Sequence, residues 1–280
     1  MTDETPVVRT ERRGNVLWVV IDRQDRRNAI NDAVVDGIGG ALSAAATDKT
    51  LRAIVLTGAG RKAFCAGGDL QQGTSVFGDR IEEPTTNFGR LARLARAFPK
   101  PVVARVNGAC VAGGMGLIAL CDIVVAADHA RFGLPEARVG VFPMQVQVYF
   151  RNLILPRHVM ELCLTGDLID AARAREIGLV NYVVPEAELD LKVQHLLERL
   201  AGASPVAIRR GKFAMAAMET MGFHEAIAFA ESQIMLTAMT ADAREGLAAF
   251  VEKRKPKWAE GEVGTRSEEH TSELQSPCNL

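Results

Sequence analysis

Residues 100–127 read KPVVARVNGACVAGGMGLIALCDIVVAA, and this stretch decides the fold class. It opens with an apolar, β-branched run at 100–107, which predicts a strand. A glycine-rich turn then leads into an apolar helix that we expect over 113–120, and a second apolar strand follows at 121–127. Strand, helix and strand in direct succession indicate a sheet covered by helices.

The same alternation continues towards the N-terminus. We expect strands at 16–22 and 52–58, and helices at 31–46 and 88–98. The first of these helices has its apolar residues at helical spacing, namely Val34, Val35, Ile38, Ala41 and Leu42. Strands that are apolar along most of their length are typical of sheets buried on both faces. The predicted fold class is therefore α/β.

The character of the chain changes at Ser204-Pro205, which predicts a helix start with Ser204 as N-cap. From there to 258 the sequence is rich in Ala, Met, Glu and Lys, and Gly222 separates one expected helix from the next. We therefore expect an α/β core at 1–203, a helical region at 204–258 and a tail at 259–280. Residues 266–280 read RSEEHTSELQSPCNL and resemble a translated sequencing-adapter oligonucleotide, so we exclude them from fold prediction as an artefactual extension.

Composition excludes several classes of protein. With 280 residues, 48% hydrophobic and 24% charged, the chain resembles neither a disordered segment nor a small disulfide scaffold. A formal charge of -1 gives no field that would recruit nucleic acid or a membrane surface. The first residues are acidic and lack the apolar core of a signal peptide. The five cysteines are far apart, which predicts reduced thiols, no metal site and a cytoplasmic protein.

Two glycine-rich segments are the candidate binding loops: AFCAGGDL at 63–70 and NGACVAGGMG at 107–116. Neither contains the GK[ST] of a P-loop or the spacing of a dinucleotide fingerprint. Glycine lets a backbone N–H approach a ligand closely, and two such amides on one oxygen would form an oxyanion hole. Taken alone, however, glycine turns of this kind serve tight packing more often than binding.

The motifs together resemble the enoyl-CoA hydratase/isomerase (crotonase) family over about residues 8–258. The matching segments are RRNA at 26–29, FCAGGDL at 64–70, NG at 107–108, AGGMG at 112–116, CD at 121–122, FGLPE at 132–136 with Gly140 and Pro143, LTG at 164–166, AA at 171–172, GLV at 178–180 and EGLAAFVEKR at 245–254. The resemblance implies a spiral of repeated ββα turns and a C-terminal helical region that forms a homotrimer or hexamer. It also implies an acyl-CoA thioester as substrate, with no separate cofactor.

The resemblance also assigns catalytic positions. The amides of Gly68 and Gly113 would hold the thioester oxygen, and Glu136 matches a glutamate that transfers protons in this family. Typical hydratases of the family carry another glutamate, at the position that Gly116 occupies in this chain. Met144 occupies a position that is often glycine in the family. An Asp at position 144 would have indicated a nucleophilic dehalogenase.

Substrate-binding residues are predicted around these positions. Ala66, Asp69, Gly114 and Met144 would contact the acyl thioester, Arg26 and Arg27 the CoA phosphates, and Phe250 and Lys253 the adenine end, which a neighbouring subunit could supply. For Asp69 and Asp122 a role as local caps or structural acceptors outweighs a catalytic one. We interpret Cys65 and Cys110 as packing residues, and the basic end of the last helix could equally be a solvated helix end.

Three functions fit this pattern. A hydratase with a single glutamate is favoured, with branched or glutaconyl-type acyl groups as candidate substrates. A Δ3,Δ2-enoyl-CoA isomerase is the alternative, because moving a proton from one carbon to another needs only one base. A catalytically silent acyl-CoA-binding paralogue is the third possibility, and the retained Glu136 and both loop glycines argue against it.

Overall fold

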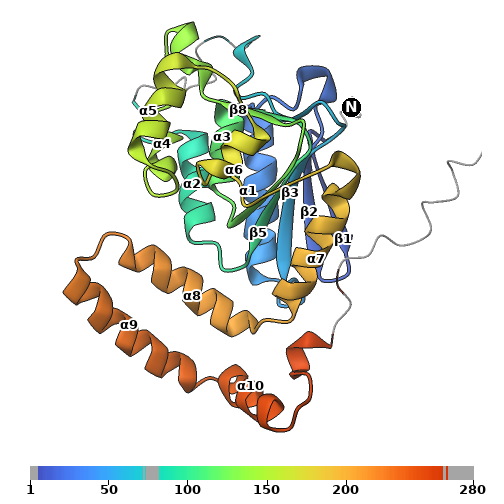
Figure 1. Cartoon of the computed structure of the whole chain (residues 1–280), viewed down its shortest axis with the longest axis vertical. Coiled ribbons are helices and arrows are strands. Elements are labelled where there is room, and N and C mark those ends of the chain that lie inside the picture. Colours follow the sequence, from blue (N-terminus) through green and yellow to red (C-terminus); the bar gives the residue numbers. More distant parts are fainter. Residues whose placement is uncertain (1–5, 72, 74–81, 261–262, 264–280) are drawn as a thin grey trace, which may run out of the picture.

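The computed structural model describes residues 6–71, 73, 82–260 and 263 (Figure 1). A six-stranded sheet has the order β1 (Val8–Arg13), β2 (Val16–Ile21), β3 (Ala53–Gly58), β5 (Val102–Val106), β7 (Ile123–Ala127) and β10 (Tyr182–Val184). Only the β1–β2 pair in this sheet is antiparallel. A second sheet has the order β4 (Ala63–Cys65), β6 (Ala109–Val111), β8 (Arg131–Gly133) and β9 (Ile169–Asp170).

The two sheets are built by a repeated turn of chain. Each of β3, β5 and β7 in the large sheet is followed by a strand of the small sheet, β4, β6 or β8 respectively. A helical segment then completes the turn: α2 (Asn87–Arg96), α3 (Gly113–Ala119) or the 3-10 helix η3 (Pro135–Val139). Because β4, β6 and β8 pair in parallel, successive turns stack on one another. This arrangement confirms the predicted ββα spiral.

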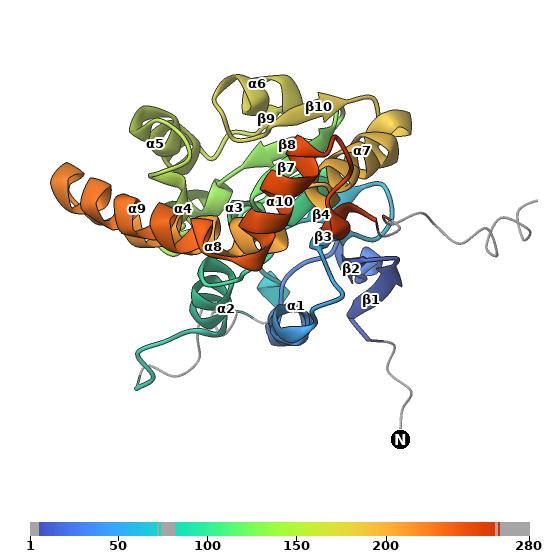
Figure 2. The ribbon, with the colours of Figure 1, turned by 90° about the horizontal axis from the view of Figure 1, so that it is seen from below.

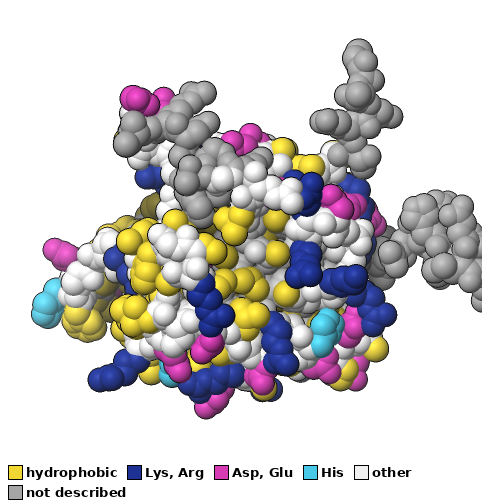
Figure 3. Space-filling model, turned by 90° about the horizontal axis from the view of Figure 1, so that it is seen from above, with side chains coloured by type: hydrophobic (Ala, Val, Ile, Leu, Met, Phe, Trp, Pro, Cys, Tyr) yellow, Lys and Arg dark blue, Asp and Glu magenta, His cyan; other side chains and the backbone are white. Residues whose placement is uncertain are grey.

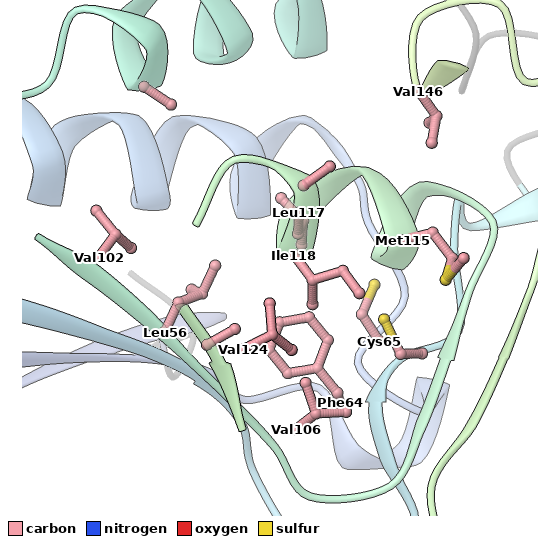
Figure 4. Packing of buried hydrophobic residues seen from close by; sticks show 14 of the residues in the cluster. Leu56, Phe64, Cys65, Val102, Val106, Met115, Leu117, Ile118, Val124 and Val146 are labelled. Carbon is pink, nitrogen blue, oxygen red and sulfur yellow. The ribbon is translucent and has the colours of Figure 1, made fainter. Parts of the chain in front are cut away.

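Helices cover both faces of the large sheet, as the apolar strands predicted. On one face α1 (Asp32–Thr47), α2 and α3 pack on side chains such as Val19, Ile54 and Val124. On the other face α7 (Leu189–Ala201) packs on Trp18, Val55 and neighbouring residues. Figure 4 shows the first layer closely, with Leu117 and Ile118 of α3 directed towards Phe64 and the sheet. This packing fixes the start of α3 relative to the end of β4.

The remaining elements form the outer part of the body and the C-terminal region. They are η1 (Gln24–Arg26), α4 (Gln147–Phe150), α5 (Pro156–Thr165), α6 (Ala171–Glu176), η4 (Glu186–Glu188), α8 (Pro205–Met218), α9 (Phe223–Ala238), α10 (Ala241–Val251) and η5 (Lys257–Ala259). The helices α8, α9 and α10 extend along one end of the body in Figures 1 and 2. This confirms a helical C-terminal region, whereas the extension at 266–280 lies outside the described residues.

The predicted cap at the start of α8 is present. Ser204 accepts a hydrogen bond from the Ala207 amide at 3.0 Å, and Pro205 occupies the first helical position. Lys212 ties α8 to the body, because its Nζ donates to the Lys100 carbonyl at 2.9 Å and also to the Asp122 carboxylate. Asp122 further accepts from the Val102 amide, so it acts as the structural acceptor that the sequence indicated. Among the described residues, no helix is long and apolar enough to cross a membrane.

Candidate active site

A cavity of about 1200 Å³ opens where the repeated turns bring their helix starts together. The first residues of α1, α2 and α3 line it, along with the loop after β4 and the segment from η3 to Val146. Of the residues predicted to form the site, Ala66, Gly68, Gly113, Glu136 and Met144 line this cavity. It therefore joins both glycine loops and the predicted catalytic glutamate.

The Gly68 amide is oriented by the peptide group that precedes it. Ile30 donates its amide to the Gly67 carbonyl at 2.7 Å, and the Asp69 amide donates to the Ile30 carbonyl at 2.8 Å. In a trans peptide the C=O and N–H point in opposite directions, so the Gly68 N–H points away from Ile30. Gly67 itself has φ +94°, and a Cβ on it would lie 2.7 Å from the Ala112 Cβ. Position 67 therefore requires glycine.

The Gly113 amide begins α3, where the first N–H groups have no partner within the helix. Ala112 before it has φ 51° and ψ −122°, a conformation that a non-glycine residue rarely adopts and that costs about 1–3 kcal/mol. A Cβ on Gly113 would lie only 3.7 Å from the Gly68 nitrogen, so the two loops are in contact. Neither amide donates to another group within the described residues. Two free N–H groups side by side can stabilise a developing negative charge on oxygen.

An ion pair that the sequence analysis did not single out supports the Gly68 loop. Arg23 donates to the Asp69 carboxylate at 2.8 Å and to the Ala29 carbonyl at 2.7 Å. The hydrogen bond from Arg23 holds the pKa of Asp69 below its ordinary range. Asp69 is 8% exposed and does not line the cavity. Its carboxylate thus fixes the loop rather than facing a ligand, which is the structural role the sequence favoured.

Glu136 is the buried carboxylate of the cavity. It lies in η3 directly after Pro135, is 8% exposed, and its Oε2 has no hydrogen-bond partner among the described residues. Burial raises the pKa of Glu136 above the ordinary value of a glutamic acid. A carboxyl group whose pKa is shifted towards neutrality is suited to both accept and return a proton.

The raised pKa of Glu136 predicts a pH-dependent effect on stability. Below the unfolded-state pKa of about 4.3, both folded and unfolded chains keep the proton, so Glu136→Gln should leave the melting temperature nearly unchanged. As the pH rises through the folded-state pKa, the wild type has to bury a charge and the variant does not. The variant should therefore melt at a higher temperature at pH 7–8, as thermal unfolding between pH 4 and 8 would show. A difference independent of pH would contradict this account.

The other predicted binding residues lie outside the cavity. Gly114 packs on β4, where a Cβ would meet the Cys65 carbonyl at 2.4 Å. Arg26 bonds to the side chain of Gln71, and Arg27 ends η1 with φ 50°. The predicted CoA-binding residues Phe250, near the end of α10, and Lys253, just after this helix, are exposed and also lie outside the cavity.

Burial fits the packing role predicted for the cysteines beside the loops. Cys65 and Cys110 are fully buried, and burial raises the pKa of the Cys65 thiol to about 12. Cys163 on α5 lies near Glu136; burial, with a contribution from the Glu136 charge, raises the pKa of its thiol to about 11. These thiols stay protonated at neutral pH. Among the described residues, no three His, Cys, Asp or Glu side chains are grouped as metal ligands would be.

Comparison with known proteins agrees with this geometry. The family model described as enoyl-CoA hydratase/isomerase matches residues 11–261. The 2,3-dehydroadipyl-CoA hydratase of Escherichia coli K12 is 34% identical over 252 residues, covering 88% of this chain and 95% of the relative. The carnitinyl-CoA dehydratase of the same strain is 35% identical over 256 residues, covering 88% and 96%. A crystal structure of an enoyl-CoA hydratase from Mycobacterium smegmatis superposes with a TM-score of 0.82 at 30% identity, covering 91% of this chain and 99% of that one. The chain therefore belongs to the enoyl-CoA hydratase/isomerase family and is an enzyme of that type.

Proposed function

We propose that this enzyme adds water to the C2–C3 double bond of an enoyl-CoA, with Glu136 as its only proton-transfer group. The observation that carries the proposal is the composition of one cavity. It holds a buried carboxylate and two adjoining loop amides, and within the described part of the chain neither the Glu136 Oε2 nor these amides have a hydrogen-bond partner. These are the groups needed to polarise a thioester carbonyl and to move a proton at the neighbouring carbons.

In the proposed reaction the thioester oxygen accepts hydrogen bonds from the amides of Gly68 and Gly113. Ionised Glu136 takes a proton from water while the water oxygen forms its bond to C3, and the π electrons of the double bond move to give an enolate. The two amides stabilise the enolate oxygen. Glu136 then returns the proton to C2, which leaves a 3-hydroxyacyl-CoA and a regenerated carboxylate. Each amide would contribute about 3–4 kcal/mol to transition-state stabilisation.

The names of the relatives favour hydration and its reverse, because they include a hydratase and a dehydratase. The dehydroadipyl-CoA relative also supports the prediction that dicarboxylic, glutaconyl-type acyl groups are candidate substrates. One observation favours a Δ3,Δ2-enoyl-CoA isomerase as second candidate. Position 116 is glycine and is packed against apolar side chains, so this position supplies no second carboxylate to share the water with Glu136. An isomerase would use Glu136 alone to move a proton between C2 and C4.

A panel of substrates separates these reactions. Purified enzyme is incubated with 2-enoyl-CoAs and 3-enoyl-CoAs of matched chain length, and the products are identified by mass and chromatography. A gain of one water from the 2-enoyl-CoA supports the hydratase. Conversion of the 3-enoyl-CoA to an isomer of the same mass, with no hydration of the 2-enoyl-CoA, would overturn the hydratase in favour of the isomerase. Binding without either reaction would support a silent acyl-CoA-binding protein.

We further propose a homotrimer or hexamer in the cytoplasm, with Arg26, Arg27, Phe250 and Lys253 contacting CoA. The helices α8 to α10 expose a large apolar surface that a monomer would leave in water. Its members on these helices and at the C-cap of α9 are Phe213, Met215, Phe223, Ile227, Ile234, Met235, Leu236, Met239, Leu247, Phe250 and Val251. Since Phe250 and Lys253 lie outside the cavity of their own chain, a neighbouring subunit would have to bring them to the bound CoA. The free thiols of the described cysteines fit a reducing compartment.

This assembly is directly measurable. Because the exposed side chains of α8 to α10 become buried between subunits, we expect sedimentation of the full chain at micromolar concentration to give three or six times the monomer mass. A monomer at that concentration would exclude both the oligomer and a CoA site shared between subunits. Figure 3 shows the molecule from the side opposite to α8 to α10, where hydrophobic side chains gather on one side as well.

A further inference from the structure

The space beside Gly116 is occupied by an aromatic ring from another helix. A Cβ built on Gly116 would lie 2.7 Å from Cζ of Phe88 and 3.0 Å from Cγ2 of Val146. Phe88 belongs to the first turn of α2, and Val146 precedes α4. Figure 4 shows Val146 above the end of α3 that carries Met115. Any side chain at position 116 would therefore have to displace the ring of Phe88.

Position 116 lies next to two residues that line the cavity, Phe88 and Val146, but does not line it itself. Gly116 follows Gly113 by three residues on α3, so the two lie on the same side of the helix and about 4.5 Å apart along its axis. Phe88 and Val146 both line the cavity. With the thioester oxygen at the Gly113 amide, the ring of Phe88 would lie within reach of the carbons next to the thioester.

Hydrogen bonds hold this apolar wall in place. Thr86 caps α2 by accepting from the Gly89 amide at 2.9 Å, and it also accepts from Gln145 Nε2 at 2.7 Å. The start of α2, which carries Phe88, is thereby tied to the segment that carries Val146. Farther along α2, the Tyr149 hydroxyl donates to the Ala92 carbonyl at 2.6 Å. These hydrogen bonds fix the two segments that carry Phe88 and Val146 relative to each other.

We propose that Phe88 is a specificity-determining residue of this enzyme, a role that rests on the acyl-CoA reaction proposed above. Its ring and Val146 form an apolar wall that occupies the space of a side chain at position 116 and packs against the acyl carbons near the thioester. The wall sets the size of the acyl group at C3. It also leaves Glu136 as the carboxylate that acts on the substrate.

The first experiment measures selectivity with unreactive ligands, so that it does not depend on turnover. Dissociation constants of butyryl-CoA and of 3,3-dimethylbutyryl-CoA are determined calorimetrically for the wild type, Phe88→Ala and the control Leu94→Ala. Leu94 lies on the same helix and packs on the core, but it does not line the cavity. Methyl groups in an apolar pocket discriminate about 10- to 200-fold. We therefore expect Phe88→Ala to shift the ratio of the two constants at least tenfold towards the branched ligand, and Leu94→Ala to leave it unchanged.

The second experiment tests the contact itself by thermal unfolding of Gly116→Ala in two backgrounds. In the wild-type background, the new Cβ meets the ring and the melting temperature should fall. In the Phe88→Ala background the ring is gone and only Cγ2 of Val146, at 3.0 Å, stays close to the new Cβ. The helix preference of alanine over glycine then offsets the remaining contact, so the fall in melting temperature should be much smaller or reversed. An equal fall in both backgrounds would show that Phe88 does not hold this space and would overturn the proposal.

The results of these experiments, together with the turnover assay, separate the proposed role of Phe88 from the proposed enoyl-CoA reaction. Turnover of an enoyl-CoA without a change of the binding ratio in Phe88→Ala overturns the role of Phe88 alone. A tenfold change of the ratio without turnover of any enoyl-CoA supports the wall and overturns the reaction. An equal change of the ratio in Leu94→Ala would assign the effect to general loosening of α2, and failure of the wild type to bind either ligand would overturn both proposals.

Discussion

Glu136→Gln is expected to lower turnover of the best enoyl-CoA by about 10²–10⁴-fold, the usual contribution of a positioned general base. Glutamine keeps the shape and size of the side chain but cannot accept a proton. The amides of Gly68 and Gly113 are untouched by the change, so binding of the thioester should persist. Steady-state kinetics with a parallel measurement of substrate affinity checks both parts of this expectation.

Glu83→Gln is the matched control for that variant. Glu83 also lines the cavity, but its side chain is exposed, unlike that of Glu136. We expect this control to keep wild-type turnover. If Glu136→Gln keeps more than about a tenth of the activity while Glu83→Gln loses it, the base is Glu83. If both variants keep their activity, the neighbouring Glu82 is tested next.

Gly113→Pro should lower turnover by about 10²–10³-fold, because proline has no N–H to donate to the developing enolate oxygen. The first position of a helix tolerates proline, so α3 can still begin there. Ala112 is already in a rare conformation, however, so circular dichroism and thermal unfolding have to accompany the kinetic assay.

Gly113→Ala separates loss of the amide from a change of shape at the same position. The closest contact of its Cβ would be with Cδ1 of Ile30 at 3.0 Å, the end of a flexible side chain, while the Gly68 nitrogen at 3.7 Å is at ordinary van der Waals distance; the N–H would be retained. This variant should keep most of the turnover. Equal losses in the alanine and proline variants would mean that Gly113 is needed for packing and not for its amide.

Much of the fold follows from local sequence. The apolar runs at 16–22, 52–58, 100–107 and 121–127 correspond to β2, β3, β5 and β7, because strands buried on both faces need apolar side chains throughout. Ser204 and Pro205 mark the start of α8 through their cap geometry alone. The small sheet is less evident, because β4, β6 and β8 are only three residues long, and β4 and β6 lie within the glycine-rich segments.

Some residues of the candidate site could be predicted from sequence motifs, and others become evident only from the packing of the elements. Gly68, Gly113 and Glu136 stand in motifs, and the structure brings all three to one cavity. Phe88 gives no signal of its own in the sequence, because its position against Gly116 depends on how α2 packs on α3. The burial of Glu136 likewise depends on α5 packing against η3. Arg23 could have been noticed only from its distant partner, Asp69, which is 46 residues away.

The central claim is that Glu136 moves the proton at the acyl α-carbon while the two amides stabilise the enolate. Exchange of α-protons in heavy water tests it most directly, since the α-proton step is common to hydration and isomerisation. The wild type and Glu136→Gln are each incubated with the bound product thioester, and deuterium at C2 is followed by mass. We predict exchange by the wild type and a loss of about 10²-fold or more in the variant. Equal exchange rates in the two proteins, with equal binding, would contradict the assignment of Glu136.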